Sequence, residues 1–335
     1  MTRRPDFFLV GAPKSGTTAL YEYLRQHPEI YLPARKEMRF FGSDLEIRDR
    51  RRLSLEEYLA EFAEAGDAGR VGSAYVWYLF SRAAAREIHG FAPDAQIIAM
   101  LRNPLDMLHA LHGEHLSNGN EDIADFPAAL DAEEDRRAGR RIPPHAHLPQ
   151  GLLYSEVPRY CEQVGRYFAE FGRSRVHVIV FDDFAADTPR VYRETLRFLG
   201  VAEDFAPTEF AVVNRSHRTR SEWFRHFLAR PPEPVRRVIR WTMPAPLRRA
   251  LYERAKRANA AVAPRAPMPE ATRERLRREF AEEVERLSAL LERDLSGWLR
   301  GDGRLEPQPE ADRASVEPGD ASASPRSARA ETSSS

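Results

Sequence analysis

An apolar run close to the N-terminus leads directly into a glycine-bearing turn and then into a helix-forming stretch. Residues 6–10 predict a buried strand, residues 11–16 (GAPKSG) a tight turn, and the spacing from Thr17 a helix that stops before Pro28. The unpaired N–H groups and the positive dipole end of such a helix face the turn and attract an anion. The sequence therefore predicts a phosphate-binding βα unit, with a loop formed by Pro13, Lys14, Ser15, Gly16, Thr17 and Thr18.

Two further apolar runs repeat this order of strand and helix. Residues 96–101 (QIIAML) predict a core strand that ends at Arg102, and residues 176–181 (VHVIVF) predict another. Alternating strands and helices are typical of an α/β fold with a P-loop-like, mainly parallel sheet flanked by helices, and ligands bind such sheets at the carboxyl ends of the strands. Because the loop at 11–18 and Arg102 both follow strands, we expect them to face one site.

Helix signals account for much of the remaining chain. Ser54, with Glu57 three residues later, forms a capping-box pattern for a helix through Glu64. We expect residues 1–300 to form one domain and residues 301–335, rich in Ser, Ala, Pro and acidic residues, to form a disordered tail. Further helices are expected over 127–140, 153–171, 189–199 and 270–299, with a short extended piece at 30–33.

The glycine loop departs from the pattern of a Walker nucleotide-binding loop. Its Gly-x4-Gly spacing matches, but Thr17 stands where a Walker loop requires lysine, and Lys14 lies inside the loop. The strand at 96–101 ends in Arg102, whereas magnesium-dependent NTPases commonly place an acid on a neighbouring strand. These differences favour a metal-free anion site with cationic clamps. A P-loop-like kinase or NTPase remains an alternative, which a requirement for ATP and magnesium would support.

Composition excludes several classes of protein. The 51 Lys+Arg balance 51 Asp+Glu, which argues against a general nucleic-acid binder. The single cysteine, Cys161, excludes an internal disulfide framework and a multi-cysteine metal site. No run approaches the roughly 20 apolar residues of a membrane span, and the N-terminal apolar run is too short for a signal peptide. We therefore expect a cytoplasmic protein.

A second segment with catalytic potential is Arg35-Lys36-Glu37-Met38-Arg39-Phe40-Phe41. On its own, a carboxylate between cations favours a surface salt-bridge cluster. In the functional alternative, Glu37 is a general base, and Phe40 and Phe41 fix the segment against the core. Lysine is rare here, with arginine supplying almost all of the basic residues, yet Lys14 and Lys36 both lie in these candidate segments.

Three motifs occur in the order strand-PKSGTT-helix, KExxFF and strand-RNP-helix. Together they resemble the sulfotransferases that use 3′-phosphoadenosine 5′-phosphosulfate, above all the Golgi carbohydrate and heparan-sulfate type and its bacterial relatives. The resemblance extends over roughly residues 7–299 and implies a single sulfotransferase domain, that donor nucleotide and no metal. It also implies sulfuryl transfer to a hydroxyl, or less readily an amine, of a small-molecule, glycan or lipid acceptor.

The resemblance further implies a role for each motif. Lys14 would contact the bridging or leaving oxygen, while the amides of residues 15–18 and the two threonine hydroxyls would bind the 5′-phosphate. Arg102 would bind the 3′-phosphate, and Glu37 would be the catalytic base. In-line transfer moves negative charge onto the leaving phosphate, which a fixed ammonium stabilises.

Two departures from the family pattern stand out. Ala110 replaces a serine of the 3′-phosphate motif, a loss of roughly 1.5–3 kcal/mol for one hydrogen bond to a charged group, which Ser117 or a later loop would have to offset. No Lys-Gly-Arg loop appears late in the chain; residues 214–220, with Arg218, are the best substitute. Ala110 also motivates the alternative of a relative that binds nucleotide without turnover.

Other residues carry weaker functional signals. Residues 221–257 interleave cations with aromatics, which favours a solvated helical face over a surface for peripheral membrane contact or an anionic acceptor. Three histidines follow the RNP motif on one helix, and one of them is an alternative base or a residue lining the acceptor pocket: His109, His112 and His115. Three aromatics are expected in the core rather than stacked on adenine: Tyr75, Trp77 and Tyr78.

Overall fold

Five parallel strands form the central sheet, in the order β2-β3-β1-β4-β5. The computed structural model describes residues 3–48, 51–207, 210, 217–219, 260–262 and 267–300. The parallel sheet confirms the α/β fold predicted from the alternation of strands and helices. The strands are β1 (Phe7–Gly11), β2 (Ile30–Tyr31), β3 (Arg70–Ala74), β4 (Gln96–Leu101) and β5 (Val176–Val180).

Helices cover both faces of this sheet, because the side chains of its central strand alternate between two apolar clusters. Phe8 and Val10 of β1 pack into one cluster, and Phe7 and Leu9 pack into the other. The first cluster receives α2 (Leu55–Ala60), α3 (Ala84–Phe91), α7 (Tyr160–Phe171) and α13 (Glu270–Leu291). The second receives α1 (Thr17–Leu24), α8 (Phe181–Ala186) and α9 (Thr188–Leu199).

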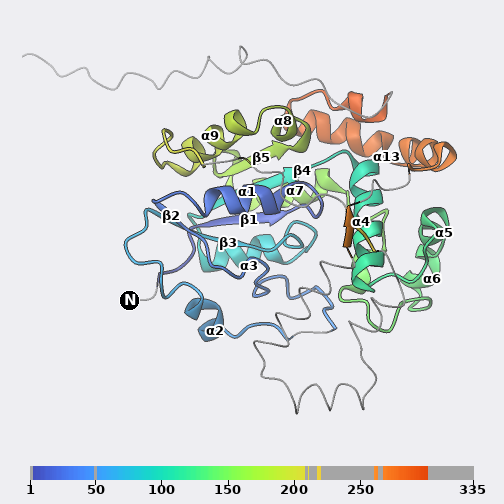
Figure 1. The fold of residues 1–335 in the computed structure, drawn as a ribbon, viewed down its shortest axis with the longest axis horizontal. Helices are drawn as coiled ribbons and strands as arrows, with labels where there is room; N and C mark the ends of the chain where they lie inside the picture. The colour runs from blue at the N-terminus through green and yellow to red at the C-terminus, as the bar shows by residue number, and fades with distance from the viewer. Residues whose placement is uncertain are drawn as a thin grey trace, which may run out of the picture.

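Helix α4 (Pro104–Asn118) rises directly from the carboxyl end of β4. The Asn103 side chain accepts a hydrogen bond from the Leu105 N–H (2.9 Å), and Pro104 occupies the first turn, where a missing N–H costs nothing. In Figure 1, α4 stands beside the sheet with α5 (Phe126–Asp131) and α6 (Glu133–Arg137) beyond it, and α13 packs against α4 and α7. The start of α4 is therefore fixed at the edge where ligands bind.

Some predicted helices are shorter than their sequence patterns. The capping box of Ser54 and Glu57 is confirmed, but α2 ends at Ala60 rather than Glu64. The helix expected over 153–171 begins only at Tyr160, because Pro158 lacks an N–H and interrupts the pattern. The stretch 127–140 forms the two helices α5 and α6, and 270–299 is divided into α13 and the 3₁₀ turn η3 (Ser296–Leu299).

Strand β3 is absent from the sequence-based expectation. The glycine at its centre, Gly72, weakens the strand signal. The structure explains the glycine, because a Cβ at this position would lie 2.2 Å from the Phe7 ring and 2.6 Å from Leu32. Close approach of neighbouring side chains, rather than local strand preference, therefore selects the residue at this position.

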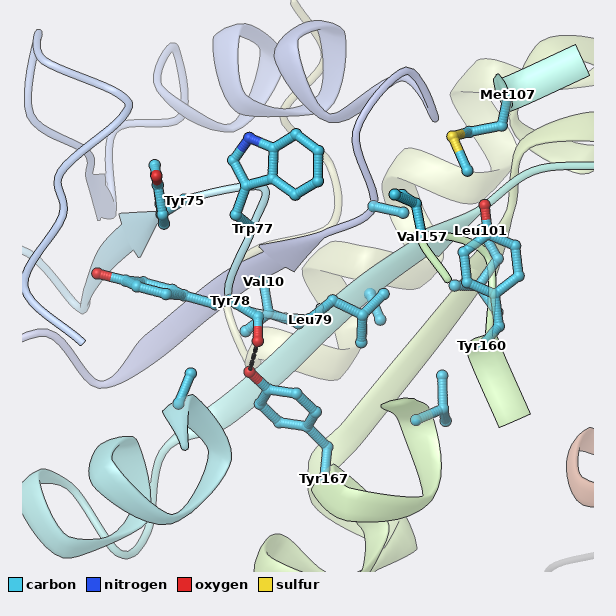
Figure 2. Packing of buried hydrophobic residues seen from close by; sticks show 14 of the residues in the cluster. Val10, Tyr75, Trp77, Tyr78, Leu79, Leu101, Met107, Val157, Tyr160 and Tyr167 are labelled. Atoms are coloured by element: carbon cyan, nitrogen blue, oxygen red, sulfur yellow. Dashed lines mark hydrogen bonds between the residues drawn. The ribbon is translucent and has the colours of Figure 1, made fainter. Parts of the chain in front are cut away.

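The aromatics Tyr75, Trp77 and Tyr78 are buried in the core, as expected (Figure 2). The Tyr167 hydroxyl donates to the Tyr78 carbonyl (2.9 Å), and the Tyr78 hydroxyl donates to the Met38 carbonyl (2.7 Å). The same Tyr78 oxygen accepts the Phe40 N–H at 3.1 Å. This part of the core thus holds the KExxFF segment in place.

Several predictions fall on residues that the structure does not describe. These are the basic aromatic stretch 221–257 and the tail 301–335. Of the late segment 214–220, the structure gives only the backbone of β6 (His217–Thr219), which pairs antiparallel with β7 (Ala260–Val262). Among the helices in the described part of the chain, none has the length and apolar character needed to cross a bilayer.

Candidate active site at the phosphate loop

The loop between β1 and α1 requires glycine at both ends. Gly11 has φ +151°, and a Cβ there would approach the Val76 carbonyl oxygen to 2.6 Å. Gly16 has φ +90°, and a Cβ there would lie 3.1 Å from the Phe181 ring. At Gly11 the positive φ and the lack of space together exclude a larger residue, whereas at Gly16 the positive φ is the main obstacle. The loop is therefore pressed against the segment that follows β3, against β4 and against the start of α8.

The N-terminus of α1 is open to an anion. Its N-cap is Gly16, and no side chain in the described part of the chain caps it. The first N–H groups of a helix have no acceptor within the helix, and the dipole places positive charge there. Ser15 is fully buried beneath this end, with its hydroxyl 3.3 Å from the Pro13 carbonyl. This end of α1 therefore presents uncapped N–H groups of the kind that an anion site requires.

Lys14 lies at the turn of the loop in the left-handed region, with φ +60°. Its ammonium donates a hydrogen bond to the Glu114 carboxylate on α4, and the two side chains are 28% and 41% exposed. Glu114 is not among the residues that the sequence motifs indicate. The sequence signal for it is weak, because it is an acidic residue that lies ten positions into a helix, outside all three motifs.

Lys36 brings the KExxFF segment to the same loop. Its ammonium donates to the hydroxyls of Thr17 (3.2 Å) and Thr18 (3.0 Å) and forms an ion pair with Glu37 at 3.0 Å. The Glu37 carboxylate also accepts the Val76 N–H at 3.2 Å, and the Glu37 backbone bridges to Ala74 at the end of β3. The two lysines noted in the candidate segments thus both lie at the loop.

Arg102 completes the cationic lining of the site. Its guanidinium donates to the Lys14 carbonyl (3.1 Å) and lies 4.6 Å from the centroid of the Phe181 ring. The neighbouring Asn103 donates to the Trp298 carbonyl (3.0 Å), and the Trp298 indole donates to Asp182 at 3.0 Å. The C-terminal turn η3 therefore holds the RNP motif against the beginning of α8.

The predicted site residues divide into two groups. Lys14, Ser15, Thr17, Thr18, Glu37 and Arg102 meet at the carboxyl ends of β1, β3 and β4, with Pro13 and Gly16 forming the turn. Arg218 lies in β6, opposite Ala261, and its side chain lies outside the description. Ala110 is buried one turn before Glu114, and Ser117 is exposed near the end of α4.

The histidines of α4 have structural contacts. His112 Nε2 lies 2.9 Å from the Ile123 carbonyl oxygen. His115 is buried and stacks on Trp77 with ring centroids 6.3 Å apart. Burial lowers the pKa of His115 to about 4, so this ring is neutral at pH 7. The suggestion that one of these histidines replaces Glu37 as base stays a prediction.

The arrangement can bind a multiply charged anion and remove a proton beside it. Two ammonium groups, a guanidinium and an open helix N-terminus converge on the loop, while the Glu37 carboxylate is 42% exposed and held by two donors. A group of this kind is able to accept a proton from a neighbouring hydroxyl. The geometry therefore suits transfer of an anionic group.

Comparison with known proteins finds similarity to sulfotransferases. No model of a known protein family matches the sequence. Mouse carbohydrate sulfotransferase 15 is 29% identical over 164 residues, covering 36% of this chain and 29% of its own length. Mouse bifunctional heparan sulfate N-deacetylase/N-sulfotransferase 4 is 28% identical over 218 residues, covering 61% of this chain and 23% of its own length. The chain thus spans less than a third of the length of these curated relatives.

A solved bacterial structure matches over its whole length. The crystal structure of a sulfotransferase from Alicyclobacillus acidocaldarius is 31% identical, with a TM-score of 0.66. The match covers 89% of this chain and 100% of that chain. Because the two chains share a fold and are 31% identical over the whole length of the bacterial protein, the chain belongs to the sulfotransferase family.

Proposed function

We propose that this protein transfers a sulfuryl group from 3′-phosphoadenosine 5′-phosphosulfate to an acceptor hydroxyl, or less readily an amine, without a metal ion. The observation that carries the proposal is the convergence of Lys14, Lys36 and Arg102 on the uncapped N-terminus of α1. Hydrogen-bond donors and positive charge at such a position match a nucleotide that carries several negative charges. The residues present therefore fit this donor.

In this proposal each side chain of the loop has a separate task. The N–H groups of residues 15–18 and the hydroxyls of Thr17 and Thr18 bind the 5′-phosphate, and Arg102 binds the 3′-phosphate. Lys14 stabilises the negative charge that develops on the leaving oxygen. The bound donor supplies an activated sulfuryl group whose leaving group is a phosphate.

Glu37 is proposed as the general base. The Val76 N–H and the Lys36 ammonium orient its carboxylate, and the exposed fraction of Glu37 leaves room for an acceptor hydroxyl beside it. It would take the proton of that hydroxyl as the new bond to sulfur forms. The acceptor is proposed to be a small molecule, glycan or lipid; cytoplasmic location, membrane contact through 221–257 and a domain boundary at residue 300 stay predictions.

Calorimetric titration with 3′,5′-adenosine bisphosphate tests the donor site. We expect metal-independent binding to the wild-type protein and roughly 10- to 100-fold weaker binding to Lys14→Ala, because one charge-assisted contact contributes about 1.5–3 kcal/mol. Arg86→Ala is the matched control, because it removes a highly exposed cation of α3 that pairs with Glu170. Its affinity should stay within about twofold of the wild type.

Two outcomes would contradict the proposal. Preference for ATP with magnesium over the bisphosphate would favour the kinase or NTPase alternative. Tight bisphosphate binding without sulfuryl transfer to any of a broad panel of hydroxyl and amine acceptors would favour the non-catalytic relative that Ala110 suggests.

A further inference from the structure

Lys14 is held at both of its ends, by its backbone carbonyl and by its ammonium group. Its carbonyl accepts a hydrogen bond from Arg102 at 3.1 Å, which fixes the backbone. Its ammonium is bound by the Glu114 carboxylate, which α4 carries to the loop from the end of β4. Arg102 and α4 both follow the carboxyl end of β4, so the residues after this one strand set the position of Lys14.

Ala110 lies one helical turn before Glu114 on α4. Residues three and four apart lie on one face of a helix, so Ala110 and Glu114 share a face. Ala110 presents only a methyl group, and Glu114 is the neighbouring polar side chain that reaches the loop. An acid therefore stands beside a cation of the proposed anion site, where a carboxylate would compete with a phosphate for the ammonium.

We propose that Glu114 is a positioning residue: it holds the Lys14 ammonium over the loop in the free protein and yields it to the nucleotide, thereby lowering nucleotide affinity. This inference rests on the proposed function. The pair is partly exposed, and ion pairs of that kind are weak, so an incoming phosphate can replace the carboxylate. After transfer the carboxylate competes for the ammonium again and favours release of the product nucleotide.

The sign of the effect follows from Coulomb's law. Glu114→Gln removes a negative charge next to the anion site, so no carboxylate competes with the phosphate for the Lys14 ammonium. Bisphosphate affinity should therefore rise about three- to tenfold. The KM for the donor and kcat should fall together, because the product leaves more slowly. A residue that only supported the fold would give weaker binding when substituted.

The experiment is a calorimetric titration of the full chain with 3′,5′-adenosine bisphosphate at fixed salt. It compares the wild type with Glu114→Gln and with Glu114→Asp, which keeps the charge on a shorter side chain and should stay within about twofold of the wild type. The matched control is Glu156→Gln. Glu156 is 40% exposed and pairs with Arg137 at 3.1 Å rather than with a loop residue, so its substitution should leave affinity unchanged.

The outcomes separate this inference from the proposed function. No bisphosphate binding by the wild type would contradict the proposed function itself. Binding by the wild type, with equal or weaker binding by Glu114→Gln, would overturn the inference and leave the function standing. A loss of kcat beyond about 100-fold at unchanged affinity would also overturn it, because Glu114 would then act as a proton acceptor. Thermal melts of the unliganded variants verify that each is folded, and Glu114→Ala, which also removes the charge and should raise affinity in the same direction, replaces the glutamine variant if that variant is not folded.

Discussion

Two glutamates at the end of α4 form ion pairs that differ above all in burial. Glu114 pairs with Lys14 at the loop, and both side chains are substantially exposed. Glu121, just beyond α4, pairs with Arg136 of α6 at 2.8 Å, and both side chains are 0% exposed. Glu121 also accepts the N–H groups of Asp122 and Ile123 and the hydroxyl of Tyr154, all within 3.0 Å.

This difference separates stability from binding. The carboxylate of Glu121 is surrounded by donors, so both charges of its pair are committed to the fold. A buried pair of this kind is costly to break, because the remaining partner keeps an uncompensated charge in the core. The Lys14–Glu114 pair is exposed enough to exchange partners at little cost, so the charge of Lys14 is available to a ligand.

The largest effect expected from the exposed region is on catalysis. Glu37→Gln should lower kcat by about 10²- to 10⁴-fold, because the acceptor loses its base, while the thermal midpoint stays unchanged. Transfer of radiolabelled sulfate to a panel of hydroxyl acceptors measures it. Glu61→Gln is the control, since that glutamate pairs with Arg35. Unchanged turnover would remove Glu37 from the mechanism.

The buried pair should show the opposite behaviour. Glu121→Ala should lower the free energy of unfolding by about 3–5 kcal/mol in urea titrations, because Arg136 is left buried and unpaired. The folded fraction should still bind bisphosphate with wild-type affinity. Equal losses of stability in Glu121→Ala and in Glu114→Gln, which breaks the exposed pair at the loop, would remove the distinction between the two regions.

The buried His115 makes the stability of the protein dependent on pH. Its pKa is lowered to about 4 by burial, against 6.5 for an exposed histidine, so the unfolded chain binds the proton more tightly. This contribution to stability is present above pH 6.5 and is lost as the pH falls through 4, up to about 3 kcal/mol. Chemical unfolding across this range should show a steeper acid loss in the wild type than in His115→Phe. Parallel curves would contradict a neutral buried ring.

The smallest effect concerns the ring beneath Arg102. Phe181→Leu removes a cation–π contact at the site and should weaken bisphosphate binding about two- to fivefold, an energy of about 0.5–1 kcal/mol. The contact of Arg173 with the Phe168 ring at 4.7 Å gives a control, because Phe168→Leu removes a similar pair from another part of the surface. The two variants should differ in affinity but not in stability; equal affinities would mean that Phe181 does not orient Arg102 for binding.

Local sequence signals predicted the elements that lead to the site. The apolar run of β4 and its end at Arg102 match the structure, as does the start of α1 at Thr17. The capping box at Ser54 was also confirmed. These features depend on hydrogen bonds and side-chain spacing within a few residues, so the sequence expresses them directly. Pro158, by contrast, was a local signal that the amphipathic pattern around it obscured.

Contacts between residues far apart in the sequence could not be predicted from local patterns. Strand β3 lies between β1 and β2 because Gly72 makes room for Phe7 and Leu32, which no local pattern reports. The approach of Lys36 to Thr17 and Thr18 depends on Tyr78, whose hydroxyl fixes the segment after Glu37. The role of Arg218 stays a prediction, because its side chain lies outside the described residues.

The sequence alone determined a parallel α/β fold, a glycine loop at a helix N-terminus and the cations that follow the strands. Packing between distant elements sets which charges meet: Glu114 reaches Lys14 because α4 leaves β4 alongside the loop, and Glu121 is buried in the core with Arg136. Periodicity and capping, by contrast, are local properties of the chain. The burial of a charge, and therefore its freedom to bind a ligand, depends on packing between elements that are far apart in sequence.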